Sequence, residues 1–325
     1  MTTFDRIKVV FPARHIGIIK GFQTITEDDR IKNKSFLQKY PCYVSISVNY
    51  DTDKARIEFT SKVLKKRYDE KINYNNIAYC LEAIKSMGVC KLDVDSILED
   101  AEVEKCDVTK DVAGIDLPDL KTHIGTHIAN YNQWTLKPIK NNDNVILEKN
   151  VVTSRNKRRL SIYDKEDEMS KATNKDYLAW AGNEVKNSFK GITRFELSLT
   201  TCAAIRSVLK VTDTRLETVL NAEANPIADL LDSALRKDTC FTSTITTLSQ
   251  FDKQTTLAYY NWDIEAIEKN ARIIYKERYH KNKLEPYQRL IDAHAHNALS
   301  RPTPMTSKHY VRLTPMRSNV LPQLP

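Results

Sequence analysis

The stretch RNKRRLSIYDK, residues 155–165, organises the interpretation of this sequence. Read as a β-strand, it places Leu160 and Ile162 on one face, because side chains alternate along a strand. Tyr163 and Lys165 fall on the opposite face, among further cations. A tyrosine surrounded by positive charge on the polar face of a strand is poorly suited to a core and well suited to meeting a phosphate.

A phenol attacks phosphorus effectively only as the phenolate. Free tyrosine has a pKa near ~10, so about one molecule in 10³ is ionised at pH 7, a gap of roughly 4 kcal/mol. Lys165 or a bound metal can close part of this gap by favouring the anion. The alternative is an exposed tyrosine on an edge strand among solvated charges, and this stretch alone leaves both interpretations open.

The chain is basic, and its cations are clustered. Lys and Arg number 50 against 42 Asp and Glu in 325 residues, which gives a net charge of +8. Dense basic runs at 62–67 and 155–159 favour a polyanionic partner. Nucleic acid is favoured over a membrane, because no amphipathic terminal segment accompanies these runs. The residues expected to contact DNA are Lys62, Lys65, Lys66, Arg67, Arg155, Lys157, Arg158, Arg159 and, on a later strand, Arg194.

Other global features point to an intracellular protein. No run approaches the ~18 apolar residues of a membrane span. The first six residues lack the apolar core of a secretory signal, so a cytoplasmic location is expected. The six cysteines are irregularly spaced and form no C-x-x-C pair, which predicts reduced thiols rather than a zinc ribbon or a disulfide framework.

The pattern along the chain predicts an α+β fold. Strands are expected at 6–11, 42–50, 55–60, 101–112, 135–139, 144–152, 155–165 and 192–199, with the second and third forming a hairpin through about four residues. Helices are expected at 75–87 and 117–131, and with polar breaks from about 201 onward. The predicted organisation is a domain at 1–205, a helical region at 206–300 and an irregular, proline-containing tail at 301–325, with the boundary near 205–212.

Three acidic residues, like the tyrosine, lie on the polar face of a predicted strand. Glu58, Asp107 and Glu196, like Tyr163, lie on polar faces of strands whose other faces are apolar. In one sheet they would gather three carboxylates and a phenol, a donor set that suits Mg²⁺ or Mn²⁺. A single such carboxylate is usually just solvated. The polar-face Arg194, like Arg56, either contacts phosphate or pairs with a neighbouring glutamate, and the sequence leaves this open.

Four short motifs in order carry a family resemblance. They are RIEFTSKVL at 56–64, KCDVT at 105–109, RLSIYDK at 159–165 and TRFEL at 193–197. Over roughly residues 40–205 this set resembles the gene II replication endonucleases of filamentous phages. More distantly, it is similar to rolling-circle initiators of the plasmid Rep-trans type.

The resemblance implies a fold and a reaction. The fold would be relaxase-like, with a central antiparallel sheet flanked by helices and followed by a mostly helical C-terminal region. Tyr163 would nick one strand of origin DNA, become joined to the 5′ phosphate and free a 3′ hydroxyl for rolling-circle replication. Lys165 would steady the phenolate or the scissile phosphate, with Lys62 a weaker candidate. The residues expected to bind the metal or structure the site are Glu58, Asp107 and Glu196.

The resemblance also implies the setting. The partner would be single-stranded or supercoiled origin DNA in the cytoplasm of a bacterial host cell, with a host helicase as a further candidate and no membrane. Two departures stand beside it: the chain beyond 205 matches loosely, and the motifs contain no His-x-His metal pair of the kind that wider relaxases use. Two functions stay open as alternatives, namely a non-catalytic nucleic-acid-binding protein and a relaxase of a mobilisable element.

Other histidine and tryptophan patterns point more weakly to function. His294 and His296 fall in a helical stretch, where side chains at i and i+2 point about 200° apart and cannot share a metal. His123 and His127 can share a helix face, but without an adjacent glutamate a solvated surface is the better interpretation. The tryptophans are more typical of packing than of base stacking: Trp134, Trp180 and Trp262.

Overall fold

The computed structural model describes residues 2–27, 30–127, 134–137, 144–149, 158–235, 248–260, 263–275 and 284–291. The chain divides into two compact units, Met1–Lys121 with Thr135–Asp229 and Thr122–Trp134 with Leu230–Pro325. The predicted α+β class is confirmed. The division near 229 differs from the expected boundary near 205–212, because helices that follow the last strand still pack on the sheet. The expected tail at 301–325 lies outside the described residues.

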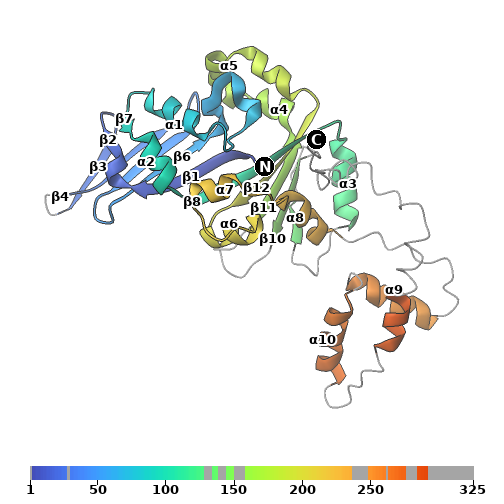
Figure 1. Ribbon diagram of the computed structural model, residues 1–325. Helices are drawn as coiled ribbons and strands as arrows, with labels where there is room; N and C mark the ends of the chain where they lie inside the picture. Colours follow the sequence, from blue (N-terminus) through green and yellow to red (C-terminus); the bar gives the residue numbers. More distant parts are fainter. Residues whose placement is uncertain are drawn as a thin grey trace, which may run out of the picture. The chain divides into compact units, whose positions relative to one another are not determined.

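A ten-stranded antiparallel sheet dominates the first unit (Figure 1), in the order β3-β4-β5-β6-β1-β8-β12-β11-β10-β9, and β2 pairs with β7 in a separate two-stranded sheet. The strands are β1 (Phe4–Pro12), β2 (Ile16–Ile18), β3 (Gln23–Glu27), β4 (Arg30–Gln38), β5 (Val44–Asn49), β6 (Lys54–Thr60), β7 (Cys90–Leu92), β8 (Glu102–Ala113), β9 (Trp134–Lys137), β10 (Val145–Lys149), β11 (Arg159–Asp164) and β12 (Ile192–Leu199).

Helices surround this sheet and continue after it. The α-helices are α1 (Ile77–Lys85), α2 (Val94–Asp100), α3 (Leu117–His127), α4 (Lys165–Met169), α5 (Lys175–Ala181), α6 (Cys202–Leu209), α7 (Leu216–Leu220), α8 (Pro226–Ala234), α9 (Leu248–Tyr259) and α10 (Ile264–Tyr275). The 3₁₀ helices are η1 (Ala13–His15), η2 (Ser61–Glu70), η5 (Ala172–Asn174) and η6 (Asn183–Phe189). Within the described residues, no helix is long and apolar enough to cross a membrane.

The alternation predicted for the strands is confirmed, and it gives the sheet one apolar face. On β6, Ala55, Ile57 and Phe59 are fully buried, whereas Glu58 between them is partly exposed. Helix α2 contacts β1, and α6 contacts β8 and β12, and Figure 1 shows these helices lying over the sheet. Burial of this apolar face is the main source of stability for the first unit.

The opposite, polar face of the sheet is partly covered, so some of its polar side chains are buried rather than exposed to water. Helix α4 contacts β11 and β12. On this face of β8, Asp107, which was predicted to lie on the polar side, is 6% exposed, and Thr109 is 2% exposed. A buried carboxylate needs a partner or a function, because removing its charge from water is costly.

Two local predictions are corrected by the structure. Strand β11 ends at Asp164, and Lys165 begins α4 rather than continuing the strand. The Asp164 side chain accepts a hydrogen bond from the Asp167 amide, which is the capping arrangement that starts a helix. Strands β3 and β4 were not predicted, because residues 23–38 carry polar and apolar side chains without a clean alternation.

The described part of the second unit after residue 248 is mainly helical. Leu257 of α9, Ile267 of α10 and Leu284 form a small buried cluster, with partly buried aromatic and aliphatic side chains around it. Apolar positions three and four residues apart on each helix supply this packing.

Candidate active site

A pocket of about 420 Å³ opens on the polar face of the sheet. Its floor comes from β1, β6, β11 and β12, and its walls come from η2, α4, η5 and the connection between β4 and β5. The lining residues are Asp5, Lys39, Tyr40, Pro41, Tyr43, Thr60, Lys62, Tyr68, Tyr163, Lys165, Glu168, Thr173, Asn174 and Glu196. Segments far apart in sequence therefore place carboxylates, cations and phenols around one cavity.

The phenol of Tyr163 is bonded to a carboxylate across the sheet. Tyr163 lies directly opposite Arg194 on β12, so Glu196, two residues on, is its diagonal neighbour on the same face. The Tyr163 hydroxyl donates a hydrogen bond to Glu196 Oε2 at 2.8 Å. A nucleophile and a proton acceptor within hydrogen-bonding distance are the basic requirement of general-base catalysis.

Burial changes the acidity of both partners. Burial, together with the negative charges of Asp5 and Asp107, raises the pKa of Glu196 to about 7. Burial and the neighbouring Glu196 carboxylate raise the pKa of Tyr163 well above 10. The structure therefore favours a neutral phenol beside a proton acceptor, rather than the preformed phenolate that the sequence suggested. A base with a pKa near 7 is well matched to accepting a proton at neutral pH.

Lys165 lies in this pocket but holds other partners than expected. It is 2% exposed, and its Nζ donates to Glu168 Oε2 at 2.6 Å and to Tyr68 Oη at 2.8 Å. Its Nζ is 5.6 Å from the centre of the Tyr163 ring. Burial and the neighbouring Arg194 lower the pKa of Lys165. Lys165 is thus held in the pocket lining by Glu168 and Tyr68 and is not a direct partner of the Tyr163 hydroxyl.

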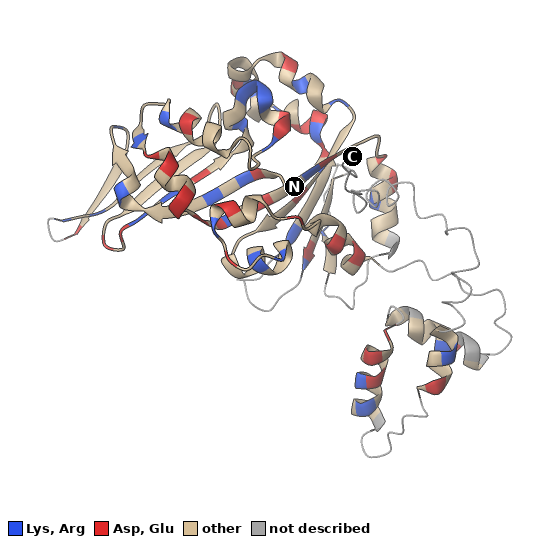
Figure 2. Cartoon of the chain, in the orientation of Figure 1, with Lys and Arg blue, Asp and Glu red and all other residues tan. Residues whose placement is uncertain are grey.

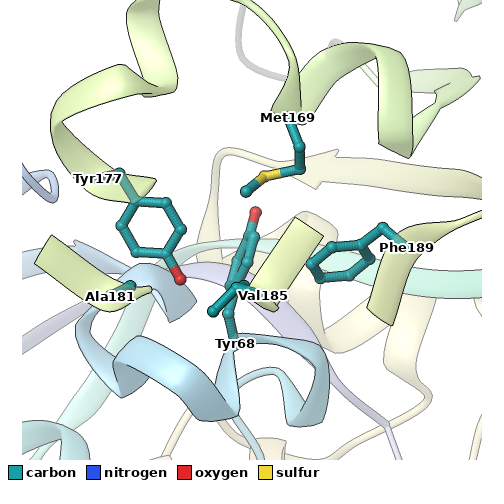
Figure 3. Close-up of a cluster of buried hydrophobic side chains, with 6 residues drawn as sticks. All are labelled: Tyr68, Met169, Tyr177, Ala181, Val185 and Phe189. Carbon is teal, nitrogen blue, oxygen red and sulfur yellow. The ribbon is translucent and has the colours of Figure 1, made fainter. Parts of the chain in front are cut away.

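An aromatic cluster under the pocket holds this lysine in place. Tyr68 of η2 packs with Tyr177 and Phe189 edge to face, at centroid distances of 5.6 and 5.2 Å. Figure 3 shows these three rings, from η2, α5 and η6, converging with Met169 from α4. Apolar packing around a buried cation removes water from it and fixes its position, so the charge is preorganised.

Arg194, expected to contact DNA, is instead completely buried. Its guanidinium is bidentate to Asp111 at 2.8 and 2.9 Å and also donates to Asp5 at 2.7 Å and to Tyr68 at 3.1 Å. Although burial alone would raise the pKa of Asp5, Arg194 and Lys165 outweigh it and lower that pKa to about 2. With its donors engaged inside the protein, Arg194 supports the pocket floor and does not reach a phosphate.

Two buried oxygen atoms beside the floor lack a protein partner. Thr60 Oγ1 and Asp107 Oδ1 find no hydrogen bond among the residues that the structure describes. Burial raises the pKa of Asp107, and the nearby Asp5 adds to the effect, while Ser198 and Lys105 oppose it. Unsatisfied buried oxygens call for an explanation, and a bound cation or polar ligand is one.

Glu58 does not join the other two predicted carboxylates. It lies on β6, three strands from Glu196, which is about 14 Å at ~4.8 Å per strand. Its Oε1 is 2.7 Å from Arg6 Nε and 3.1 Å from Lys105 Nζ, so it is neutralised within the sheet. Across the described residues, no three His, Cys, Asp or Glu side chains gather closely enough to hold a metal. The expected convergence of three acids is therefore incorrect for Glu58.

The basic residues predicted to bind DNA separate into distinct environments. Lys62 lines the pocket and donates to Asn174 Oδ1 at 2.6 Å. Lys66 and Arg67 are exposed and paired with Glu184 and Glu70. Arg158 contacts Ser207 Oγ at 3.4 Å, Lys65 lies 4.7 Å over the Trp180 ring, and Arg159 is exposed. Arg155 and Lys157 lie outside the described residues. Figure 2 shows basic and acidic segments adjoining on the strands of the sheet. Arg56, the other polar-face arginine considered above, pairs with Glu104 at 3.0 Å.

Sequence reasoning missed most of the pocket lining, including four residues of its hydrogen-bond network. Asp5, Tyr68, Glu168 and Asn174 contribute to the hydrogen-bond network, yet none lies in a motif with a fixed spacing. Asp5 offered a partial signal, as a polar residue at the start of a strand with apolar alternation. The others lie in short helices whose placement depends on tertiary packing.

The structure describes only some of the histidines and tryptophans considered in the sequence. Trp134 is buried, as predicted for packing, and Trp180 is 36% exposed beneath Lys65. His123 lies on α3. Outside the residues that the structure describes lie His294, His296, Trp262 and the His127 side chain.

Comparison with known proteins adds no assignment. No protein-family model matches the chain, and no curated protein matches it.

Proposed function

We propose that this protein nicks one strand of DNA by tyrosine transesterification, as an initiator of rolling-circle replication. The observation that carries the proposal is the 2.8 Å hydrogen bond from the Tyr163 hydroxyl to Glu196 within a pocket that also contains lysines. The relaxase-like arrangement expected from the motifs is part of the same proposal. The large antiparallel sheet with the pocket on its polar face is compatible with it.

The proposed step forms one bond to phosphorus, breaks another and transfers two protons. Tyr163 Oη attacks the phosphorus of a phosphodiester as its proton passes to Glu196 Oε2. The bond to the 3′ oxygen breaks, and that oxygen leaves as a hydroxyl after taking a proton from solvent. The products are a 5′-phosphotyrosyl link and a free 3′ end. In the reverse, strand-closing step, protonated Glu196 returns the proton to the tyrosine oxygen, as microscopic reversibility requires.

Charged groups around the pocket would stabilise the extra negative charge of the transition state. Lys62 and Lys165 both line the cavity. Lys165 is held by Glu168 and Tyr68, and Lys62 by Asn174, so little reorganisation is needed when the phosphate enters. Preorganised charges of this kind are usually the largest contribution to catalysis.

The residues present fit a divalent cation in part. Asp107 has an unpartnered buried oxygen, and the pKa of Glu196 is raised by burial and by the charges of Asp5 and Asp107. Mg²⁺ and Mn²⁺ often use one or two carboxylates and complete their shells with water and substrate phosphate. Asp107 would hold such an ion, whereas Glu196 is the proposed base and Glu58 is occupied by Arg6 and Lys105. When bound, the ion would neutralise charge on the phosphate.

We predict that the acidic residues differ in their effect on metal dependence. Glu58→Gln should leave the Mn²⁺ concentration for half-maximal nicking within about twofold of the wild type, because Glu58 is occupied by Arg6 and Lys105. Asp107→Asn should raise that concentration by ~10–100-fold, as loss of metal-site interactions does. Titrations of nicking rate against Mn²⁺ measure this concentration for both variants. A larger increase for Glu58→Gln than for Asp107→Asn would mean that Glu58 binds the metal, as the sequence predicted.

The direct test is identification of the covalent product. The full chain is incubated with Mn²⁺ and end-labelled single-stranded oligonucleotides tiled across the DNA that encodes it, and adducts are digested and analysed by mass spectrometry. The expected product is a peptide containing Tyr163 with a nucleotide on the phenol oxygen. Salt-sensitive DNA binding without any adduct would instead support the non-catalytic alternative.

The rate of nicking should depend on pH through Glu196. Because the base must be ionised to accept the proton, activity is lost as pH falls through the raised pKa of about 7. Single-turnover rates should fall about tenfold per pH unit below this value and level off above it. Glu196→Gln should remove this dependence and slow nicking by ~10²–10⁴-fold. A rate that keeps rising to pH 10 would indicate a preformed phenolate and contradict Glu196 as the base.

A further inference from the structure

One side of the pocket carries residues that the transfer step does not use. Lys39, Tyr40 and Pro41 form the connection between β4 and β5, and all three line the cavity. Tyr43, directly before β5, lines the cavity as well. This segment brings aromatic rings and a cation to the edge of a site where Tyr163 lies on the floor.

Tyr40 differs from the other aromatic residues near the pocket because its ring is available. It is 53% exposed, and among the described residues no aromatic ring or cation stacks on it. The ring of Tyr43 is covered by the Arg6 guanidinium at 4.4 Å, and Trp180 is covered by Lys65 at 4.7 Å. A flat apolar face left in water beside a polar cavity is suited to stacking with a planar ligand.

Lys39 adds a charge next to this ring. Its side chain is exposed, and no carboxylate of the described residues lies within ion-pairing distance. Most other surface cations considered above are paired, including Lys66 and Arg67. A free cation beside a free ring matches the alternation of phosphate and base along a single nucleic-acid strand.

We infer that the 39–41 segment is a nucleotide subsite in which Tyr40 stacks on a base flanking the scissile phosphate and Lys39 contacts an adjacent phosphate. The inference rests on the proposed function, which places the scissile phosphate in the pocket, but it concerns only the binding of DNA and not its cleavage. A base can stack on a side chain only after leaving the duplex stack. The subsite therefore selects a strand that is locally unpaired, and it is largely indifferent to which base is present, since each base has a stacking face.

The test measures binding in the Tyr163→Phe background, so that no cleavage intervenes. Fluorescence anisotropy compares a 20-nucleotide thymidine oligomer with an abasic oligomer of the same length. Adding Tyr40→Ala should weaken binding of the thymidine oligomer about tenfold, whereas Tyr40→Trp should retain it. Abasic DNA should bind both proteins equally, because no base is available to stack. Lys39→Gln should make the slope of log Kd against log salt shallower by about 0.7.

Tyr50→Ala is the matched control. Tyr50 is 46% exposed and follows the far end of β5, and it does not line the pocket. It should bind the thymidine oligomer as the parent protein does. Equal losses at Tyr40 and Tyr50, no loss at Tyr40, or an equal loss on abasic DNA would each overturn the inference. Absence of a Tyr163 adduct would overturn the proposed reaction but not this binding result, so the two failures are distinguishable.

Discussion

Replacing Tyr163 with phenylalanine should abolish the covalent DNA adduct while leaving the fold intact. The substitution removes one oxygen, and with it both the attacking atom and the proton that passes to Glu196. The ring remains, so its packing is retained. The substitution leaves Glu196 without its phenol partner, but the pKa of Glu196 is about 7, so this carboxyl can be neutral near pH 7. We expect a fall in nicking rate of at least ~10⁴-fold, since the substitution removes the atom that forms the covalent intermediate.

Two further tyrosine variants make this prediction decisive. Tyr68→Phe removes the buried phenol beside Tyr163 in the pocket, which accepts hydrogen bonds from Lys165 and Arg194. It should slow nicking yet still give an adduct at Tyr163. Tyr50→Phe, outside the pocket, should have no effect. An adduct that survives Tyr163→Phe and disappears in Tyr68→Phe would assign the nucleophile to Tyr68 instead. The measurement is adduct yield on denaturing gels, with circular dichroism to verify folding.

Replacing Arg194 with leucine should lower the free energy of unfolding by ~3–5 kcal/mol. The guanidinium is fully buried and bonded to Asp111 and Asp5, so its loss leaves two mostly buried carboxylates with reduced compensation. Lys71, 2.8 Å from Asp111, offsets part of this loss. Urea denaturation should show a lower midpoint with an unchanged slope.

The stability change at Arg194 should also depend on pH. The lowered pKa of Asp5, about 2 in the folded protein against an ordinary value of 3.8, contributes stability above pH 4 that is lost as pH falls toward 2. The difference between wild type and Arg194→Leu should therefore shrink in acid. Arg14→Leu is the control, because Arg14 forms an exposed pair with Asp100 and its loss should cost below ~1 kcal/mol. Equal midpoints for wild type and Arg194→Leu would mean that Arg194 is not buried as described.

Much of the sheet could be predicted from local pattern. Strand β12 matches its predicted range of 192–199, and β6 matches 55–60 within one residue. In both, β-branched and aromatic residues alternate with polar ones, so the apolar set can be buried in one register. Strands β3 and β4 lack this alternation, and their pairing depends on β5 being present as a template. Their absence from the prediction follows from that dependence.

For the candidate site, the sequence predicted only the face of its strand on which each side chain lies, and not which side chains meet. Alternation correctly placed Tyr163 and Glu196 on polar faces, and their strands prove to be neighbours with a diagonal register. The same alternation could not show that Arg6 would lie between Glu58 and Asp107, since strand order is not written in any local pattern. Nor could it show that Arg194 would be enclosed, because its burial comes from η2 and α4 closing over the sheet.

The sequence by itself determined the α+β class, most of the strands and the face on which each polar side chain lies, because these follow from a two-residue repeat and from local propensity. Tertiary structure alone decided which polar residues meet. It brought Tyr163 to Glu196, committed Lys165 to Tyr68 and Glu168, and neutralised Glu58 away from the pocket. Strand order and helix packing set these distances and exclude water, and both depend on long-range contacts that no short stretch of the chain encodes.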